Sequence, residues 1–440
     1  MATRTSALVS SIILLGVCAA PAGAQQPPRI INGRVTTQAA AAPLADGIRT
    51  LAGGRTDPAW IGYSVPVVAG DRRMCCGGDG STYISGSVVM VDGQAWSPCR
   101  LEPRTDNTQT SRNTTPSTAA APVQLESPDQ LAVLLRVADR RIERIRVFSP
   151  DCELDAGGRE VIWLQNVRPT ESIAMLEGLV TTEAAERRER VVDGAVSAIA
   201  LHREAAADAA LERFVAPAQP VSLRRKVTFW LGNARGARGL AVLQRLIKDD
   251  PSAEVRKSAV FGVSQSEEPG AFDALAALAR SDASTTVRSE AVFWIAQKNH
   301  DRSPAVILEA LEKDPSVQVQ KKAVFALSQL RGNTGVDPLI QAARSHQDAS
   351  VRSEAIFWLG QKAGAKAAAE ITNLIENDPD TEVKKKAVFA LSQFPKDEGV
   401  PLLIQVAKTN SNPAVRKQAM FWLAQSKDPR AIDFFAQILK

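Results

Sequence analysis

The stretch VRSEAVFWIAQ, from Val287 to Gln297, decides the fold because it recurs through the second half of the chain. A fixed period of this kind is typical of stacked helical arrays, which usually serve as binding surfaces. The pattern therefore says much about architecture and little about the partner. Copies of the frame open every 32 residues, at Leu223, Val255, Val287, Val319, Val351, Val383 and Val415.

Each repeat is predicted to contain two helices. With the first Val as place 0, the residues at places 0, 4, 5 and 8 are apolar, which is the spacing of one helix face. A second apolar stripe follows, for example Val306, Ile307, Leu308 and Leu311. Asx-Pro pairs then end the unit, because proline cannot continue a helix. These pairs are Asp250-Pro251, Asp314-Pro315, Asp378-Pro379 and Asn412-Pro413.

Two adjacent places in the first helix carry aromatic residues. Place 6 is Phe in every copy, namely Phe229, Phe261, Phe293, Phe325, Phe357, Phe389 and Phe421. Place 7 alternates between large and small, as Trp230, Gly262, Trp294, Ala326, Trp358, Ala390 and Trp422. A large ring against a small side chain fills space without strain. The alternation therefore predicts core packing for the four Trp residues and a structural unit of two repeats.

A degenerate copy precedes the regular ones. It opens at Val191 and keeps the apolar template, but Ser197 replaces the Phe. Terminal repeats carry more polar faces because no neighbour covers them. This copy is therefore expected to be the N-terminal cap of the array, preceded by a helix around 170–180.

The pattern Val-Arg-x-x-Ala-Val-x-x-Leu after an Asp-Pro turn resembles the HEAT repeat, in the short form of phycobilisome-lyase-like proteins. The resemblance covers about residues 169–440. It implies a right-handed α-solenoid of about eight 32-residue helix pairs, with the Val-Arg helix on the concave side. Arg256, Arg288, Arg352 and Arg416 resemble the structural Asp-Arg ladder of that family.

The Phe place lies roughly opposite the core-facing places on a helical wheel, with a Gln place beside it. Exposed, this face would be an apolar stripe larger than monomers usually tolerate, which would mark a binding surface. Tight curvature would instead bury the rings between neighbouring helices, and both alternatives stay open. The candidate partner-binding residues of the concave face are Phe261, Phe293, Phe325, Phe357, Phe389, Gln297, Gln329, Gln361 and Gln393.

Charged residues also follow the two-repeat unit near this face. Place 3 reads Glu290, Lys322, Glu354 and Lys386 in successive repeats. The alternation predicts a row of ion pairs between neighbouring helices, which would fix register more than recruit a ligand. Lys321, Lys322, Lys385 and Lys386 border the candidate face.

Residues 1–24 are typical of an export signal, with Arg4 before an apolar core and Ala22-Gly23-Ala24 as the cleavage site. Lipoprotein processing at Cys18 is the alternative, although Val17 is a poor residue for that cleavage. No other stretch reaches the roughly 18 apolar residues of a membrane span. The mature chain is therefore expected to be soluble and extracytoplasmic, either periplasmic or secreted.

Residues 25–57 are rich in Ala, Gly and Pro and are predicted to be a flexible leader. Residues 58–168 are predicted to form a small β-rich module, with a low-complexity loop at 104–122 that cannot bury a core. Its strand-like runs are GYSVPVV (62–68), TYISGSVVMV (82–91), LAVLLRVAD (131–139), IERIRVFS (142–149) and EVIWLQNV (160–167).

Four cysteines remain after signal removal: Cys75, Cys76, Cys99 and Cys152. An even count in an exported chain indicates disulfides. A Cys75–Cys76 bridge is sterically awkward, so each is expected to pair separately with Cys99 or Cys152. A metal site is the alternative, but adjacent cysteines without a nearby His do not match zinc-knuckle spacing.

Catalysis and nucleic-acid binding find little support in the sequence. PPRIINGRV (27–35) resembles the activation junction of trypsin-like proteases, but no GDSGG-like loop follows. All three histidines, His202, His300 and His346, lie in the repeat half. The net charge of +5 is small for 440 residues, whereas nucleic-acid binders show clustered basic stripes. We therefore expect no catalytic residue, cofactor or metal, and no nucleic acid partner.

These observations favour an exported, non-enzymatic scaffold that holds a protein or peptide on the concave face of a HEAT-like solenoid. Two alternatives remain. One is a lyase-like or isomerase-like activity on a bilin chromophore, as implied by the family resemblance, although the repeats contain no Cys to hold one. The other is a purely structural envelope component. Fold alone does not choose among the three.

Overall fold

The computed structural model describes residues 26–70, 74–75, 99–102, 129–180, 189–362 and 365–439. It divides into two compact units, Met1–Glu204 and Ala205–Lys440. Several predictions lie outside the described residues: the signal peptide at 1–24 with Cys18, the strand at 82–91, the loop at 104–122, and Cys76. No helix within the described residues is both long enough and apolar enough to cross a membrane.

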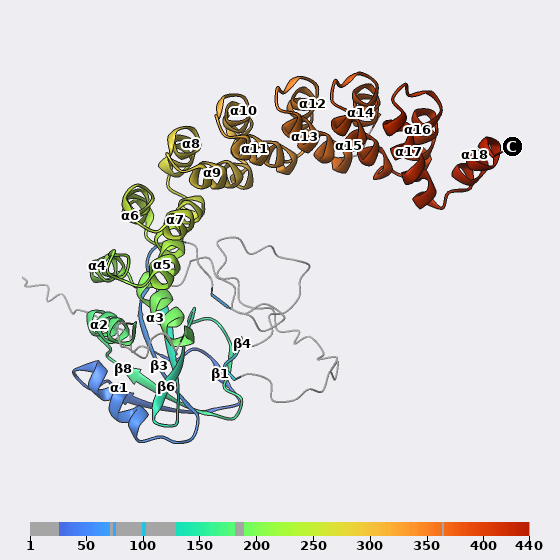
Figure 1. Ribbon diagram of the computed structural model, residues 1–440. Coiled ribbons are helices and arrows are strands. Elements are labelled where there is room, and N and C mark those ends of the chain that lie inside the picture. Colours follow the sequence, from blue (N-terminus) through green and yellow to red (C-terminus); the bar gives the residue numbers. More distant parts are fainter. Residues whose placement is uncertain are drawn as a thin grey trace, which may run out of the picture. The chain divides into compact units, whose positions relative to one another are not determined.

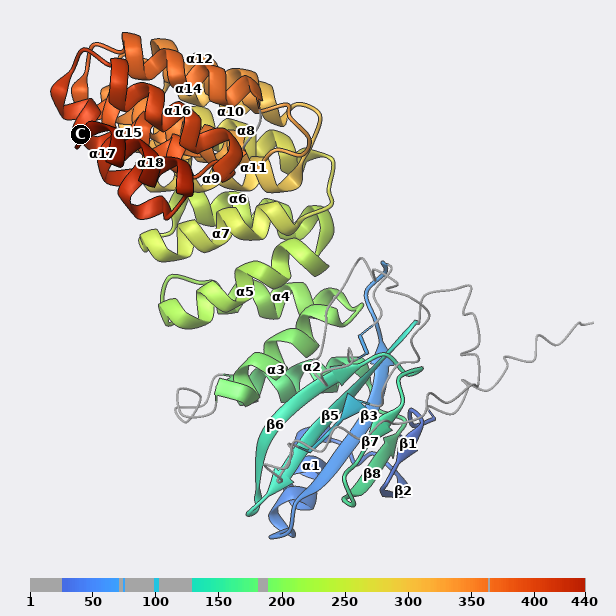
Figure 2. The ribbon, with the colours of Figure 1, turned by 90° about the vertical axis from the view of Figure 1, so that its right-hand side faces the viewer.

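The first unit is built on a five-stranded mixed sheet (Figures 1 and 2). One half of the sheet is parallel and the other is antiparallel. Strands β2 and β3 both run parallel to β8, whereas β5 runs antiparallel to β3 and β6. A smaller parallel sheet has the order β1-β7-β4. In sheet order, the strands of the larger sheet are β2 (Arg34–Ala39), β8 (Glu160–Gln165), β3 (Ala59–Pro66), β5 (Gln130–Ala138) and β6 (Arg141–Phe148). The strands of the smaller sheet are β1 (Ile30–Ile31), β7 (Leu154–Asp155) and β4 (Cys99–Arg100).

The central strands of the five-stranded sheet are covered on both faces. Helices α1 (Leu44–Gly53) and α3 (Glu189–Leu201) contact β6, and α2 (Pro169–Val180) contacts both helices. On the other face, Trp60 and Trp163 belong to a buried cluster that includes the cysteines. Because β3 and β5 are buried on both faces, they are nearly continuous apolar runs instead of alternating ones, whereas the edge strand β2 is mostly exposed.

Residues predicted to be a flexible leader instead form β1, β2 and α1. Each residue of β2 pairs in register with β8, so the segment is part of the main sheet. Leu44, Ile48 and Ala52 of α1 are buried. The Ala- and Gly-rich composition hid this apolar spacing of four residues.

Helices α2 and α3 belong to the first unit, although the sequence analysis placed them at the start of the solenoid. The reason is visible at Gly194, where an added Cβ would lie 2.3 Å from the carbonyl oxygen of Ile145 in β6. Helix α3 therefore approaches the sheet backbone closely. Ser197, at the place of the missing Phe, donates from Oγ to the carbonyl of Gly194 at 2.9 Å.

The disulfide prediction for Cys75 is confirmed. Cys75 bonds to Cys152, with Cα atoms 5.4 Å apart, and Cys99 is also disulfide-bonded. Cross-links of this kind typically contribute about 2–4 kcal/mol by restricting the unfolded chain.

The second unit is an array of antiparallel helix pairs, which we divide into inner and outer helices. The inner helices line the inside of its curve in Figure 1. They are α5 (Val221–Ala234), α7 (Ala253–Gln265), α9 (Thr285–Lys298), α11 (Val317–Gln329), α13 (Ala349–Lys362), α15 (Thr381–Ser392) and α17 (Pro413–Ser426). The outer helices are α4 (Ala205–Phe214), α6 (Gly236–Asp249), α8 (Gly270–Ser281), α10 (Ser303–Lys313), α12 (Val336–Ser345), α14 (Ala365–Asn377), α16 (Lys396–Thr409) and α18 (Pro429–Ile438).

Buried Arg–Asp pairs join successive repeats. The Nε of Arg288 donates to Asp314 at 2.6 Å, and the same carboxylate accepts from the backbone N–H of Ser316 at 2.8 Å. One aspartate thus closes the turn before the next inner helix and satisfies a buried guanidinium. The equivalent pairs are Arg224–Asp250 and Arg352–Asp378. The Arg–Asp pairs therefore recur with a two-repeat period. The other two predicted members, Arg256 and Arg416, instead donate to the backbone carbonyls of Asp250 and Asn410.

Candidate functional site

Every inner helix divides into a buried face and an aromatic face. In α11, Val319, Ala323 and Leu327 are fully buried against the outer layer. Phe325 lies on the other side of the helix and is only half-buried. All the Phe rings from α5 to α15 share this intermediate burial, and Phe421 of α17 is 51% exposed. The face therefore stays open to solvent along the array.

Rings of this face contact one another across the repeats. Phe293 and Phe325 are nearly parallel, with centroids 6.0 Å apart and an interplanar angle of 7°. The equivalent pairs one structural unit earlier and later stack at 6.0 and 6.4 Å. Trp358 bridges to the next pair, with its centroid 4.9 Å from Phe325 and 5.0 Å from Phe357. We call this set the aromatic row: Phe229, Trp230, Phe261, Phe293, Trp294, Phe325, Phe357, Trp358, Phe389, Phe421 and Trp422.

The small residue at Gly262 reflects a close approach of α5 and α7. An added Cβ on Gly262 would lie 2.4 Å from the carbonyl oxygen of Thr228, and one on Gly232 would lie 1.8 Å from that of Gly262. Only a very small residue fits where α5 and α7 approach. Trp230 is buried, whereas the other three Trp residues are half-buried and lie against Phe rings.

The rings thus combine the two alternatives left open by the sequence. They pack against each other between neighbouring inner helices, and they also keep part of their surface exposed. Aromatic contacts at these distances contribute roughly 0.5–1.5 kcal/mol each beyond burial of area. The row is therefore held in place by contacts within the array itself.

The Gln row beside the rings also follows the two-repeat unit. Gln329 donates to Ser328 Oγ at 3.0 Å, and that hydroxyl donates to the carbonyl of Phe325. Gln265 and Gln393 make the same contact in alternate repeats. Gln297, Gln361 and Gln393 are exposed, as is Gln329. Amide groups accordingly flank the aromatic row on the solvent side.

The predicted Glu–Lys row at place 3 takes a different form. Glu290 pairs with Lys257 of the preceding repeat at 2.9 Å, not with Lys322. Lys322 instead places its Nζ over the rings of Phe293 and Phe325, 5.6 and 5.4 Å from their centroids. The aromatic side chains between the helices compete for the amine through cation–π attraction.

The parts of the chain that the structure describes contain no accessible metal site and no accessible pair of a nucleophile and a base. Cys75, Asp151 and Cys152 are close enough for a metal, but the disulfide consumes both thiols. A Ser172–His202 contact of 3.0 Å exists, which the sequence analysis missed. Both residues are fully buried, and His202 Nδ1 faces the carbonyl of Ala198 instead of a carboxylate. The contact is therefore part of the core.

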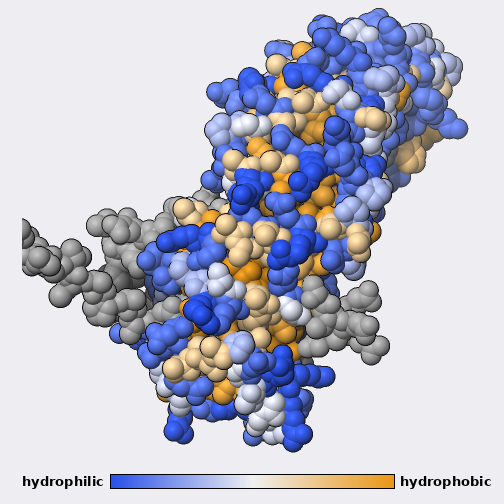
Figure 3. Space-filling view, turned by 90° about the vertical axis from the view of Figure 1, so that its left-hand side faces the viewer, coloured by the Kyte–Doolittle hydropathy of each residue, from blue (hydrophilic) through white to orange (hydrophobic). Residues whose placement is uncertain are grey.

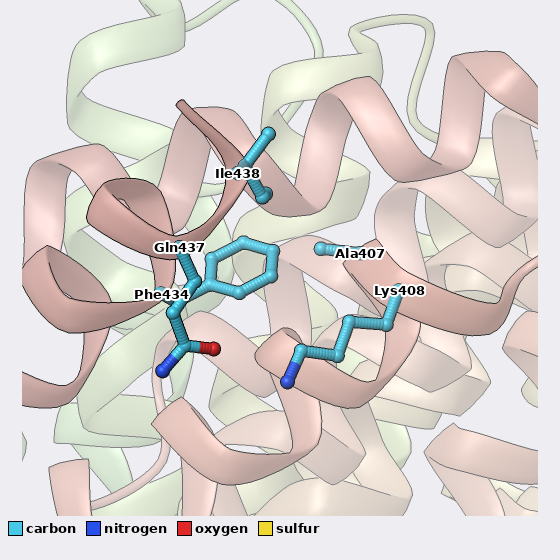
Figure 4. A pocket seen from close by; sticks show the side chains of 5 residues that line it. All are labelled: Ala407, Lys408, Phe434, Gln437 and Ile438. Carbon is cyan, nitrogen blue, oxygen red and sulfur yellow. The ribbon is translucent and has the colours of Figure 1, made fainter. Parts of the chain in front are cut away.

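Pockets in the second unit are also poor candidates for catalysis. One of about 390 Å³ lies at the end of the array, lined by Ala407, Lys408, Phe434, Gln437 and Ile438 (Figure 4). The Lys408 amine lies 5.5 Å from the Phe434 centroid, so the ring already attracts its only cation. A second, of about 620 Å³, lies between α12 and α14. Asp337, Arg344 and Glu370 line the second pocket, and Arg344 forms an ion pair with the buried Glu370.

Sequence comparison decides the family. The family model for HEAT repeats matches residues 207–296, 304–374 and 368–440. The chain belongs to the HEAT-repeat family. The matches begin just after the boundary between the two compact units, so the HEAT array and the second unit coincide. No curated protein matches the chain.

Similarity to solved structures is remote and covers part of the chain. YibA of Escherichia coli is 21% identical, with 53% of this chain and 86% of that chain covered and a TM-score of 0.34. Human deoxyhypusine hydroxylase is 15% identical, with 61% and 97% covered and a TM-score of 0.26. The CpcE–CpcF phycocyanin lyase complex of Nostoc is 16% identical, with 59% and 95% covered and a TM-score of 0.27.

Proposed function

We propose that this protein is an exported, non-enzymatic scaffold that holds a protein or peptide partner on the aromatic row of its HEAT array. The observation that carries the proposal is the continuity of the row. Rings from seven inner helices form one apolar surface that stays partly exposed. Monomeric proteins rarely leave such surfaces open unless a partner covers them.

Interface chemistry supports a polypeptide partner. Aromatic residues are enriched at the buried centres of protein interfaces, with polar groups at the rim. Here the rings form the centre, and the exposed Gln amides can exchange hydrogen bonds with a partner backbone. Export is supported by the signal-like N-terminus and by the Cys75–Cys152 disulfide, since disulfides persist mainly outside the cytosol.

The test uses truncation of two half-buried rings, Phe325→Ala with Phe357→Ala. The wild-type mature chain should capture a defined set of proteins from the extracytoplasmic fraction, and the double variant should lose it. The matched control truncates half-buried apolar residues of the outer layer, Leu278→Ala with Leu308→Ala, and should keep the set.

Thermal unfolding accompanies both variants. A cooperative transition retained by the ring variant shows that lost capture is a binding defect. Capture of the same proteins by the ring variant, or of none by the wild-type chain, would overturn the proposal.

A further inference from the structure

The two layers of the HEAT array differ strongly in charge. The inner helices contain sixteen Lys and Arg against four Glu, a formal net charge of +12. The outer helices contain eleven Lys and Arg against twelve Asp and Glu, a net charge of −1. The small net charge of the whole chain, +5, conceals this asymmetry.

Loop aspartates neutralise only part of the positive charge. The turns just before the inner helices contain six aspartates, three of which pair with the buried Arg224, Arg288 and Arg352. Counting all six leaves +6 for the inner layer; they are Asp250, Asp282, Asp314, Asp348, Asp378 and Asp380. Lys386 and Lys417 are exposed and form no ion pair with any residue that the structure describes. The inner layer therefore keeps a real excess of positive charge.

This excess lies beside the aromatic row. Places 2 and 3 of each inner helix precede the Phe place by four and three residues, which puts them on the same side of the helix. Lys322 shows the consequence directly, since its amine lies over two rings of the row. We call these lysines the basic band: Lys257, Lys321, Lys322, Lys385, Lys386 and Lys417.

We infer that the partner presents an extended acidic segment, in which Asp or Glu residues meet the basic band while apolar side chains cover the aromatic row. The inference rests on the proposed function and specifies its partner. An extended segment fits because the aromatic row runs the length of the array and the basic band recurs on α7, α11, α15 and α17, whereas α9 and α13 carry Glu290 and Glu354 at the same place. Complementary charge would steer the encounter and fix its register.

The outer layer lacks the excess of positive charge found on the inner layer. The outer helices contain basic and acidic residues in nearly equal numbers. The face that includes α4, α6 and α8 shows hydrophilic residues around strips of hydrophobic ones (Figure 3). A surface of mixed charge does not attract an acidic chain over its length. The inner layer is therefore the surface that matches such a segment.

Single-stranded nucleic acid is the other polyanion that binds aromatic and basic surfaces. Its bases stack on open ring faces. In the aromatic row, Phe325 lies between Phe293 and Trp358, and Phe389 lies between Phe357 and Trp422. Neighbouring rings occupy the places that bases would need, so the geometry favours a polypeptide.

Fluorescence anisotropy with the mature chain tests the inference. The probes are a labelled peptide that alternates Glu with Leu and Phe, a matched peptide with Gln for Glu, one with Lys for Glu, and oligo-dT. The acidic peptide should bind about tenfold more tightly than the Gln peptide. Raising salt from about 0.1 M to about 1 M shortens the screening length from about 10 Å to about 3 Å, and should remove that advantage.

The charge variant is Lys386→Glu with Lys417→Glu, chosen because neither lysine has an ion pair to lose. It should weaken acidic-peptide binding by about tenfold. The control, Lys248→Glu with Lys396→Glu, makes the same charge change on exposed residues of the outer layer and should leave affinity unchanged. Equal affinity for the Glu and Gln peptides, or tighter binding of oligo-dT, would overturn the inference.

The two proposals fail separately. If the ring variant loses its captured proteins while the charge variant keeps them all, the acidic partner is excluded and the aromatic scaffold stands. If both variants keep them, both proposals fall.

Discussion

The two units of this protein are held together over very different sequence distances. In the HEAT array, each buried Arg–Asp pair joins residues 26 positions apart, and the pattern repeats. In the first unit, the disulfide joins Cys75 to Cys152 over 77 positions, and Thr36 bonds Glu160 over 124. Periodic local contacts leave a readable trace in the sequence, whereas single long-range contacts leave almost none.

Breaking one Arg–Asp pair should produce the largest effect. Asp314→Ala leaves the Arg288 guanidinium buried without its carboxylate and removes the acceptor of the Ser316 N–H. Loss of one partner of a buried pair costs about 3–5 kcal/mol. Hydrogen exchange, followed peptide by peptide, should show lost protection in α9 to α12, with the first unit unchanged.

The last full repeat suggests the matched control for that experiment. Asn410 occupies the equivalent place and accepts from the Asn412 N–H at 3.0 Å, and the corresponding cation, Lys384, bonds the carbonyl of Glu376 instead. Asn410→Ala removes the turn acceptor without stranding a charge. It should destabilise much less than Asp314→Ala, and equal losses would show that the ion pair contributes little.

Removing the disulfide should cause the next largest loss of stability, and this loss should be confined to the first unit. Cys75→Ser with Cys152→Ser frees a long loop of the unfolded chain and should cost about 2–5 kcal/mol. Urea unfolding followed by hydrogen exchange should report an earlier transition for β3, β5 and β8. The helices of the HEAT array should keep their wild-type protection, and parallel loss in both units would contradict independent cores.

The close approach of α5 and α7 predicts a smaller loss. Gly262→Ala places a Cβ 2.4 Å from the carbonyl oxygen of Thr228, so the helices must separate. Overpacking of this kind costs about 1–3 kcal/mol. Gly270→Ala is the control, because its Cβ would meet Leu240 at 3.8 Å, an ordinary contact. Equal melting temperatures for the two variants would show that the spacing adapts freely.

The sequence was sufficient to predict the HEAT array. Its 32-residue helix pairs appear where the repeated apolar places put them, whereas the Arg–Asp pairs recur only in every second repeat. The first unit was harder, because β2 and α1 acquire their partners only through β8 and the later helices. The copy that opens at Val191 was assigned to the array for the same reason, although its helix belongs to the first unit. Its apolar face is helical in either setting, and only Gly194 hinted at contact with a strand.

The candidate site was predictable in composition but not in arrangement. The period places Phe and Gln on one side of the inner helices, which the structure shows. The period does not reveal that Trp358 contacts two Phe rings, or that Lys322 contacts the rings instead of pairing with Glu290. The charge asymmetry was equally hidden, because +5 for the whole chain becomes +12 against −1 only after each helix is assigned to a layer.

Acid should affect the first unit through Glu102, with the smallest of these effects. Burial alone raises the pKa of the Glu102 carboxyl, but hydrogen bonds from Arg136 and from the Trp60 Nε1–H outweigh it and hold the pKa below its ordinary value. A depressed pKa means that the stabilisation is complete above the unfolded value of about 4.3 and is lost as pH falls through the folded value. Glu102→Gln should therefore lower the urea midpoint of the first unit at neutral pH. The difference from wild type should shrink as pH drops below about 4. A difference that stays constant with pH would mean that shape, and not charge, makes Glu102 matter at this position.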